Sequence, residues 1–226
     1  MRRFVSAVSN LSCALAPNSE RLSLKGSACK RRAGFLMRSG MPWPDVQGAV
    51  ALAATAYENA AEFSRTGTGR ANYYPLLAQL DMQVLLEATK SPARKGRRHA
   101  ADVGADTIAR LVDEARSDAQ VRHALVPDDF HLLALPQAPL TQLLWGQVLG
   151  VPLSAKDQKT AIDGIVLGMR DVFSQNPADR VVDSVVTHFG FMLDVLAYAK
   201  PKKPAPPAII DVLTAILTQV RSRILE

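Results

Sequence analysis

This sequence has few cysteines, few aromatic residues and no long uncharged apolar run beyond its N-terminus. Two cysteines, Cys13 and Cys29, are too few for a disulfide framework or a zinc site, so we expect buried thiols in a reducing compartment. Aromatic residues make up 6% of the chain, and the abundance of Ala, Leu and Val favours helix over strand. A membrane span needs about 18 uncharged apolar residues. We therefore expect a cytoplasmic protein with no membrane partner.

The composition that remains is that of a folded protein. The chain has 226 residues, of which 48% are hydrophobic and 21% charged, enough for one sizeable domain or two small ones. Apolar residues recur at helical spacing and nowhere alternate as in a strand, which predicts an all-α fold of about nine helices. The net charge of +6 favours an anionic partner, whether nucleic acid, acidic protein or membrane surface.

The N-terminus, "MRRFVSAVSNLSCALAP", partly matches a signal peptide. Two arginines precede a mildly apolar run, and Ala14-Leu15-Ala16 offers a cleavage site. The run is interrupted by Ser and Asn residues, and Pro17 would follow the cut, where signal peptidase works poorly. A packed helix is favoured, because one helical face carries apolar side chains at Phe4, Val5, Val8, Leu11 and Leu15.

Residues 18–85 predict three successive helices joined by short connections. Asn18 or Ser19 caps the first, Pro44-Asp45 begins the second, and Asn72 caps the third. Gly40 and the segment 64–70 are expected to end the first two. Short connections favour antiparallel packing. The expected buried stripes are Leu22, Gly26, Cys29, Ala33 and Leu36, then Val46, Val50, Ala53, Tyr57 and Ala60, then Leu76, Leu77, Leu80, Val84 and Leu85.

The remainder predicts further helices within a single helical-repeat domain spanning residues 1–226. Residues 1–89 hold its best-defined helices, 90–99 a basic solvated loop, 100–199 further helices, 200–207 a stiff Pro/Lys linker and 208–226 a terminal helix. The apolar region 126–151 contains Pro136 and Pro139, and we expect a kinked or split helix pair there. Ser154 with Asp157 opens another helix, and Asn176-Pro177 begins the next.

The first helices resemble the tetratricopeptide pattern, in which a small residue on one helix faces a small residue, an aromatic and an alanine on the next. Gly26 takes the first position, and Ala53, Tyr57 and Ala60 take the others. The segments "ERLSLKGSACKRRA", "AATAYENAAEF", "NYYPLL" and, later, "DSVVTHFGFMLDVLA" resemble the tetratricopeptide-like sensor domain of bacterial conflict and defence systems. That domain is often joined to a caspase-like protease. The resemblance implies antiparallel helix pairs stacked as a repeat array.

The chain also departs from that family. Pro136 and Pro139 interrupt a region where the family has a continuous helix, and Cys29 stands where an aromatic residue is usual. No effector domain is evident in the sequence. The resemblance therefore implies either a sensor or adaptor that acts on a separate protein effector, such as a caspase-like protease, or a piece of a larger polypeptide.

Candidate ligand-binding residues lie at two places in the first helices. Lys30, Arg31 and Arg32 are consecutive basic residues that cannot all be buried, and with nearby Arg21 they could form a cationic ligand-binding face, although a solvated helix end explains them more simply. Asn72, Tyr73 and Tyr74 follow a glycine-containing loop at a helix start, where backbone donors favour anions. Helix capping and packing explain these three more simply. The loop "GTGRAN" lacks the lysine and hydroxyl of a Walker sequence, so nucleotide binding there is not predicted.

The alternative function is that of a basic, all-helical nucleic-acid-binding subunit. Its candidate residues are Arg94, Lys95, Arg97 and Arg98, which have no interleaved aromatic residue for base stacking. A solvated charged loop is the simpler interpretation. Phosphate contacts alone would give salt-sensitive binding without sequence preference.

No catalytic residue, metal site or cofactor is predicted. The four histidines, His99, His123, His131 and His188, show no metal or triad spacing, and the "DDFH" segment at Asp128 is explained by a helix N-cap. Cys29 lacks the sequence surroundings of a caspase-type nucleophile. We therefore expect a non-enzymatic sensor or adaptor that binds a protein or small ligand and relays the event to an effector.

Overall fold

The computed structural model describes residues 18–90, 104–151, 153–175, 179–199 and 207–224. Every regular element in these ranges is an α-helix, which confirms the all-α prediction for them. The chain forms two compact units, residues 1–86 and 87–226, each described here by itself. The boundary falls in the last turn of the third helix of the first unit, close to the end of the predicted segment 1–89.

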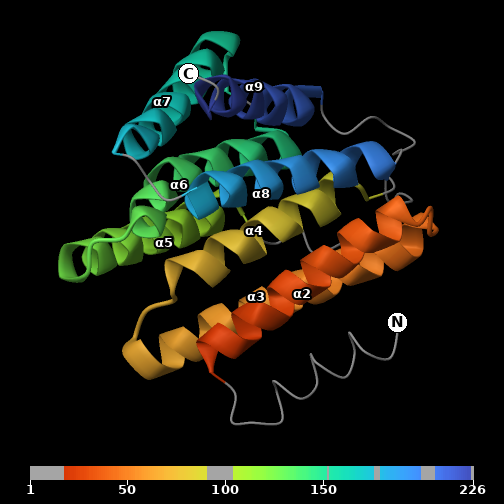
Figure 1. Cartoon of the computed structure of the whole chain (residues 1–226), viewed down its shortest axis with the longest axis horizontal. Coiled ribbons are helices and arrows are strands. Elements are labelled where there is room, and N and C mark those ends of the chain that lie inside the picture. Colours follow the sequence, from red (N-terminus) through yellow and green to blue (C-terminus); the bar gives the residue numbers. More distant parts are fainter. Residues whose placement is uncertain (1–17, 91–103, 152, 176–178, 200–206, 225–226) are drawn as a thin grey trace. The chain divides into compact units, whose positions relative to one another are not determined.

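The first unit contains α2 (Ser19–Arg38), α3 (Trp43–Thr68) and α4 (Tyr73–Ala88). Helices α2 and α3 lie side by side (Figure 1). They are antiparallel, because Ser19 at the start of α2 donates a hydrogen bond to the carbonyl of Ala60 near the end of α3 (2.9 Å). The expected antiparallel pair is therefore confirmed. Its stacking with further pairs as a tetratricopeptide-like array stays a prediction.

The predicted helix starts of the first unit are confirmed. The side chain of Asn18 accepts a hydrogen bond from the backbone N–H of Arg21 (2.8 Å), and that of Asn72 accepts from the N–H of Tyr74 (3.0 Å). Gly40, with φ +65°, follows the end of α2. These contacts satisfy backbone groups that have no partner within the helix.

The predicted segment 64–70 contains the end of α3. Helix α3 runs through the first residues of the segment 64–70 and ends at Thr68, followed by Gly69 at φ +75°. The hydroxyls of Ser64, Thr66 and Thr68 donate to carbonyls three or four residues earlier, so these side chains bond to the helix itself. Serine and threonine therefore continue the helix here, and the left-handed glycine ends it.

The α2–α3 crossing depends on Gly26. A methyl group added at this position would lie 2.7 Å from Cε1 of the Tyr57 ring, so only glycine allows α2 to approach α3 this closely. Ala53 and Ala60 flank Tyr57 on α3 and are fully buried, as the sequence predicted. On α2, Gly26, Ala33 and Leu36 are buried, whereas Leu22 and Cys29 are half-buried.

The second unit contains α5 (Ala105–Leu125), α6 (Asp129–Val148), α7 (Ala155–Ser174), α8 (Asp179–Tyr198) and α9 (Pro207–Ile224). Helix α6 packs against both α5 and α7, and α9 packs against α7 and α8 (Figure 1). The largest fully buried side chains of this unit are Ile108, Leu140, Leu144, Met169, Met192 and Leu196.

Of the kinked or split helix pair expected at residues 126–151, the split was wrong. Helix α6 is a single element from Asp129 to Val148, with Pro136 and Pro139 inside it. Each interior proline costs roughly 3 kcal/mol of helix propensity. Burial on several sides of α6 outweighs this cost, and Pro136 itself is buried, where it packs against Gly168 of α7.

The connections of the second unit are fixed by polar side chains. Asp128 caps α6 by accepting from the N–H of Phe130 (2.7 Å), and Ser154 caps α7 by accepting from the N–H of Asp157 (3.2 Å). His123 accepts from the N–H of Asp128 (3.4 Å), so this imidazole supports the α5–α6 connection. The predicted caps at Asp128 and Ser154 are both confirmed.

Among the described residues, one helix, α8, is long and apolar enough to cross a membrane by length and composition alone. It carries Asp183 and Asp194, and its buried residues Val185, Phe189 and Leu196 belong to the packed interior. A core helix of a water-soluble protein meets the same criteria. The predicted cytoplasmic location stays a prediction.

Several predictions lie outside the described residues. These are the N-terminal helix with Cys13, most of the basic loop, the helix start at Asn176-Pro177 and most of the Pro/Lys linker.

Candidate functional site

Three hydroxyl groups form a hydrogen-bonded row across the first unit, which we call the hydroxyl chain. The Oγ of Ser27 on α2 lies 3.0 Å from Oη of Tyr57 on α3 and 3.2 Å from Oη of Tyr74 on α4. Tyr57 is 2% exposed and Tyr74 is 47% exposed. The hydroxyl chain therefore runs from the interior of the unit to its surface.

The two tyrosine rings also contact each other directly. Their centroids are 6.1 Å apart and their planes meet at 89°, an edge-to-face arrangement that aromatic rings favour. Burial raises the pKa of Tyr57 above its ordinary value, and the nearby Tyr74 raises it further. The Tyr57 hydroxyl therefore stays protonated at physiological pH. Together these contacts hold the exposed Tyr74 against both α2 and α3.

Charged side chains surround this row. Lys30 on α2 is half-buried, and burial lowers its pKa to about 8, while the carboxylate of Asp81 on α4 acts in the opposite direction. Asp81 is 2% exposed. The guanidinium of Arg31 is exposed and lowers the pKa of Tyr57, so it lies near enough to act on the hydroxyl chain. Arg31 is therefore the cationic side chain whose charge acts on this row.

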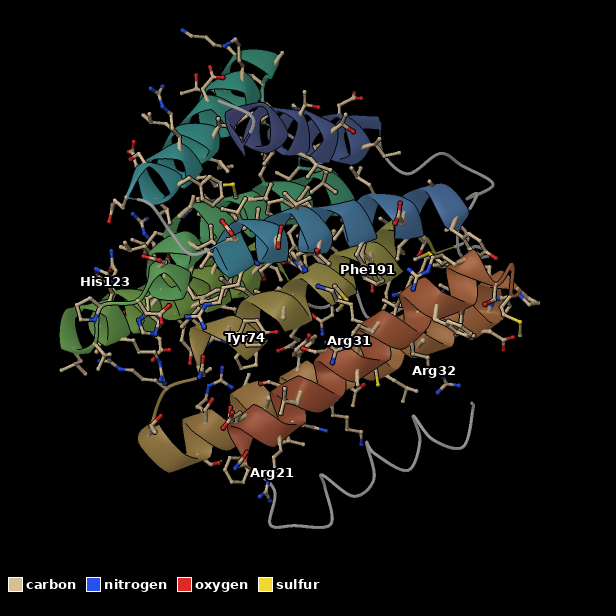
Figure 2. The ribbon with its side chains drawn as sticks, viewed as in Figure 1. Arg21, Arg31, Arg32, Tyr74, His123 and Phe191 are labelled. Atoms are coloured by element: carbon tan, nitrogen blue, oxygen red, sulfur yellow. The ribbon has the colours of Figure 1, made fainter. Side chains whose placement is uncertain are left out.

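The structure separates the predicted ligand-binding residues into two groups. Figure 2 shows Arg31 and Tyr74 where α2 and α4 face each other, whereas Arg21 and Arg32 extend away from α4. Arg21 precedes Arg31 by ten residues, or about 15 Å along the helix. Tyr73 is half-buried beside Tyr74, and Asn72 is the helix cap described above. Lys30, Arg31 and Tyr74 therefore share one region, and Arg21 lies apart from it.

Sequence reasoning missed three members of the site. The sequence predicted no ligand-binding role for Ser27 or Asp81, and it predicted Tyr57 only as part of a buried stripe. Asp81 carried a usable signal, since a lone carboxylate within the apolar run of α4 needs a partner when it is buried. Ser27 follows Gly26 directly, so a close helix crossing at Gly26 places its hydroxyl at the same junction.

Other candidate groups do not assemble around this region. Within the described ranges, no three or more His, Cys, Asp or Glu side chains are grouped to hold a metal ion. Cys29 is half-buried, and burial raises the pKa of its thiol, with Lys25 and Arg32 acting in the opposite direction. The absence of catalysis and cofactors stays a prediction. The alternative nucleic-acid residues Arg94, Lys95, Arg97 and Arg98 lie outside the described residues.

The fold and this site define an all-helical protein with a close-packed antiparallel pair and an exposed polar junction. The chain matches no protein-family model, and comparisons with curated proteins and with solved structures find no match. The tetratricopeptide-like defence sensor therefore rests on the sequence resemblance alone.

Proposed function

We propose that this protein is a non-enzymatic sensor or adaptor that binds a protein or small ligand and relays the event to a separate effector. The sequence resemblance to the tetratricopeptide-like sensors of bacterial defence systems supports the relay, with a caspase-like protease as one type of effector. The confirmed α2–α3 pair supports a binding scaffold, because helix pairs of this kind present side chains on a rigid surface.

The observation that carries the proposal is the position of Tyr74. This side chain is 47% exposed, yet its hydroxyl bonds to Ser27 and its ring packs on Tyr57. A fixed, half-exposed tyrosine loses little conformational entropy on binding, which is why tyrosines are enriched at binding hot spots. Arginine is also enriched at binding hot spots, and Arg31 is the exposed arginine on the α4 side of α2.

The matched pair Arg31 and Arg32 gives the test. Both side chains are exposed and adjacent in sequence, but only Arg31 lies toward α4 (Figure 2). Full-length protein carrying Arg31→Glu or Arg32→Glu is used to capture partners from the native host. In parallel, the shift in Tm caused by a small-molecule extract of the host is measured for both variants.

A partner or Tm shift lost with Arg31→Glu and kept with Arg32→Glu supports the proposal. Equal loss in both variants, or only background proteins with no Tm shift, contradicts it. Salt-sensitive binding of generic DNA or RNA, lost on neutralising residues 94–98, would instead select the nucleic-acid-binding alternative, which the net charge of +6 favours.

A further inference from the structure

We infer that the exposed side of α2 that carries Leu24, Arg31 and Phe35 binds an acidic amphipathic helix of a partner protein. We call these three residues, together with Tyr74 of α4, the docking face. This inference rests on the proposed function and names the chemistry of the partner. It follows from where exposed apolar side chains lie on α2 and α3 and from the charges around them.

Large apolar side chains are exposed along one line of α2. Leu24 is 54% exposed and Phe35 is 52% exposed. The two residues are eleven positions apart, which is about three helical turns or about 16 Å, so they lie on the same side of the helix. Arg31 lies on that side between them and is exposed as well. Apolar side chains that form one patch with polar residues at its edge are typical of a protein-binding surface.

Tyr74 of α4 is held beside this line. Its hydroxyl lies 3.2 Å from Oγ of Ser27, which follows Leu24 by one helical turn and precedes Arg31 by another. Its ring packs edge-to-face on Tyr57, and the side chain is 47% exposed. Figure 2 shows Tyr74 and Arg31 where α2 and α4 face each other. The docking face is therefore built on packed helices, and such preorganisation lowers the entropic cost of binding.

The charges of α2 select an acidic partner. The helix carries six basic residues and one acidic residue, a net charge of +5 out of +6 for the whole chain. The basic residues are Arg21, Lys25, Lys30, Arg31, Arg32 and Arg38. A partner that packs along Leu24 and Phe35 places its own flanking side chains in this positive potential, which favours Asp and Glu over Lys and Arg. The guanidinium of Arg31 can also bind a carboxylate through two parallel hydrogen bonds.

The shape of the docking face fits a helix. Apolar side chains at positions i, i+4, i+7 and i+11 of a partner helix form a ridge of the same length, which can pack along α2. The charge disfavours α2 of a second copy, because the two basic helices would repel each other. Nucleic acid would satisfy the arginines but would bring charged phosphates against Leu24 and Phe35. Binding to a membrane surface uses a broader apolar side than one line of residues.

Helix α3 provides a matched control. Its residues Leu52 and Phe63 are also eleven positions apart and are 52% and 43% exposed. Between them in the sequence lie the exposed acidic residues Glu58 and Glu62, of which Glu62 pairs with Arg65. An acidic helix should therefore avoid this line. A preference for α2 over α3 would report charge as well as apolar area.

The test selects binders from a phage-displayed library of randomised helical peptides, with the full-length protein as bait. We expect the enriched peptides to carry apolar residues at helical spacing on one side and Asp or Glu beside them. The Leu24→Ser/Phe35→Ser double variant should not enrich this pattern. No enrichment, or enriched peptides that lack the helical spacing or the acidic residues, would overturn the inference.

The affinity of the most enriched peptide is then measured by fluorescence anisotropy. Leu24→Ser and Phe35→Ser should each weaken binding roughly tenfold, because each removes an apolar side chain that the peptide buries. Leu52→Ser and Phe63→Ser on α3 should leave the affinity unchanged. All four side chains are exposed, and equal Tm values would show that the variants fold alike. Equal weakening by the α2 and α3 variants would contradict the docking face.

Two further outcomes separate this inference from its alternatives. Binding of a DNA oligonucleotide or of phosphatidylglycerol vesicles that Leu24→Ser and Phe35→Ser abolish would assign the docking face to another class of partner and overturn the inference. A host partner that depends on Arg31 but not on Leu24 or Phe35 would leave the sensor or adaptor proposal standing and remove only the acidic helix.

Discussion

Both units of this protein bring two helices together over a glycine, but the two junctions differ in chemistry. In the first unit, a methyl group at Gly26 would lie 2.7 Å from the Tyr57 ring. In the second, a methyl group at Gly168 would lie 3.1 Å from Cβ of Pro136. The first crossing is lined by hydroxyls and the second by an aliphatic ring. Close helix packing occurs in both units, so it does not identify the candidate site. The hydroxyl groups at the first crossing are what distinguish it.

The largest effect should come from Gly26→Ala. The added methyl group meets three atoms of a buried aromatic ring on the neighbouring helix, and such overpacking costs roughly 3 kcal/mol. Urea unfolding measures the loss. Gly48→Ala on α3 is the control, because a methyl group there meets nothing within 4 Å and should raise stability by about 0.5 to 1 kcal/mol. Equal stability of the two variants would contradict the proposed crossing.

Ser27→Ala should rank second. It removes one of the two hydroxyl partners of the buried Tyr57 donor, the other being Tyr74, and the loss of one such hydrogen bond costs about 1 kcal/mol. The double variant Ser27→Ala with Tyr57→Phe removes that donor as well, so most of the loss should be recovered. Losses that simply add in the double-mutant cycle would show that the two hydroxyls are not coupled.

Gly168→Ala should have a smaller effect than Gly26→Ala. Its methyl group would be tight against Pro136 only, and the gain in helix propensity of roughly 1 kcal/mol offsets part of the strain. We expect a net loss below about 1 kcal/mol. Gly164→Ala, on the same helix with nothing within 4 Å, should be stabilising. A loss at Gly168 larger than that at Gly26 would reverse the ranking of the two junctions.

The charge state of Lys30 gives a prediction of a different kind, namely how stability changes with pH. Its side-chain amine should titrate with a pKa of about 8, measured by NMR of the lysine amine, and Asp81→Asn should lower that pKa further. The unfolded chain loses this proton near pH 10.5, so unfolding takes up a proton between these values. The contribution of Lys30 to stability should therefore become more favourable as the pH rises from about 8 to 10.5. A pKa near 10.5 in the folded protein would show that the amine is not desolvated.

The sequence predicted the helices well where caps and glycines are strong. Asn18, Gly40, Asn72 and Ser154 each act as expected, because capping depends on neighbours within a few residues. Local signals failed where packing decides the outcome. Pro136 and Pro139 predicted a break, yet burial keeps α6 a single element.

The candidate site was predicted only in part, for the same reason. Lys30, Arg31 and Tyr74 were chosen from their type and position. Their grouping depends on Ser27 meeting two tyrosines that are 30 and 47 residues away. No local pattern encodes that contact. Only the spacing of Gly26 and Tyr57 in the tetratricopeptide-like pattern indicated where the helices cross.

The most direct test of the proposed binding site around Arg31 and Tyr74 compares two exposed leucines in native cells. Leu24 lies two helical turns before Arg31 on the same face of α2 and is 54% exposed, and Leu52 on α3 is 52% exposed. A photo-crosslinking residue is placed at either position of the full-length protein. We predict a specific crosslinked product from position 24 that weakens when Tyr74 is replaced by Ala, and none from position 52. Equal products from both positions, or a product unaffected by Tyr74→Ala, would contradict the account.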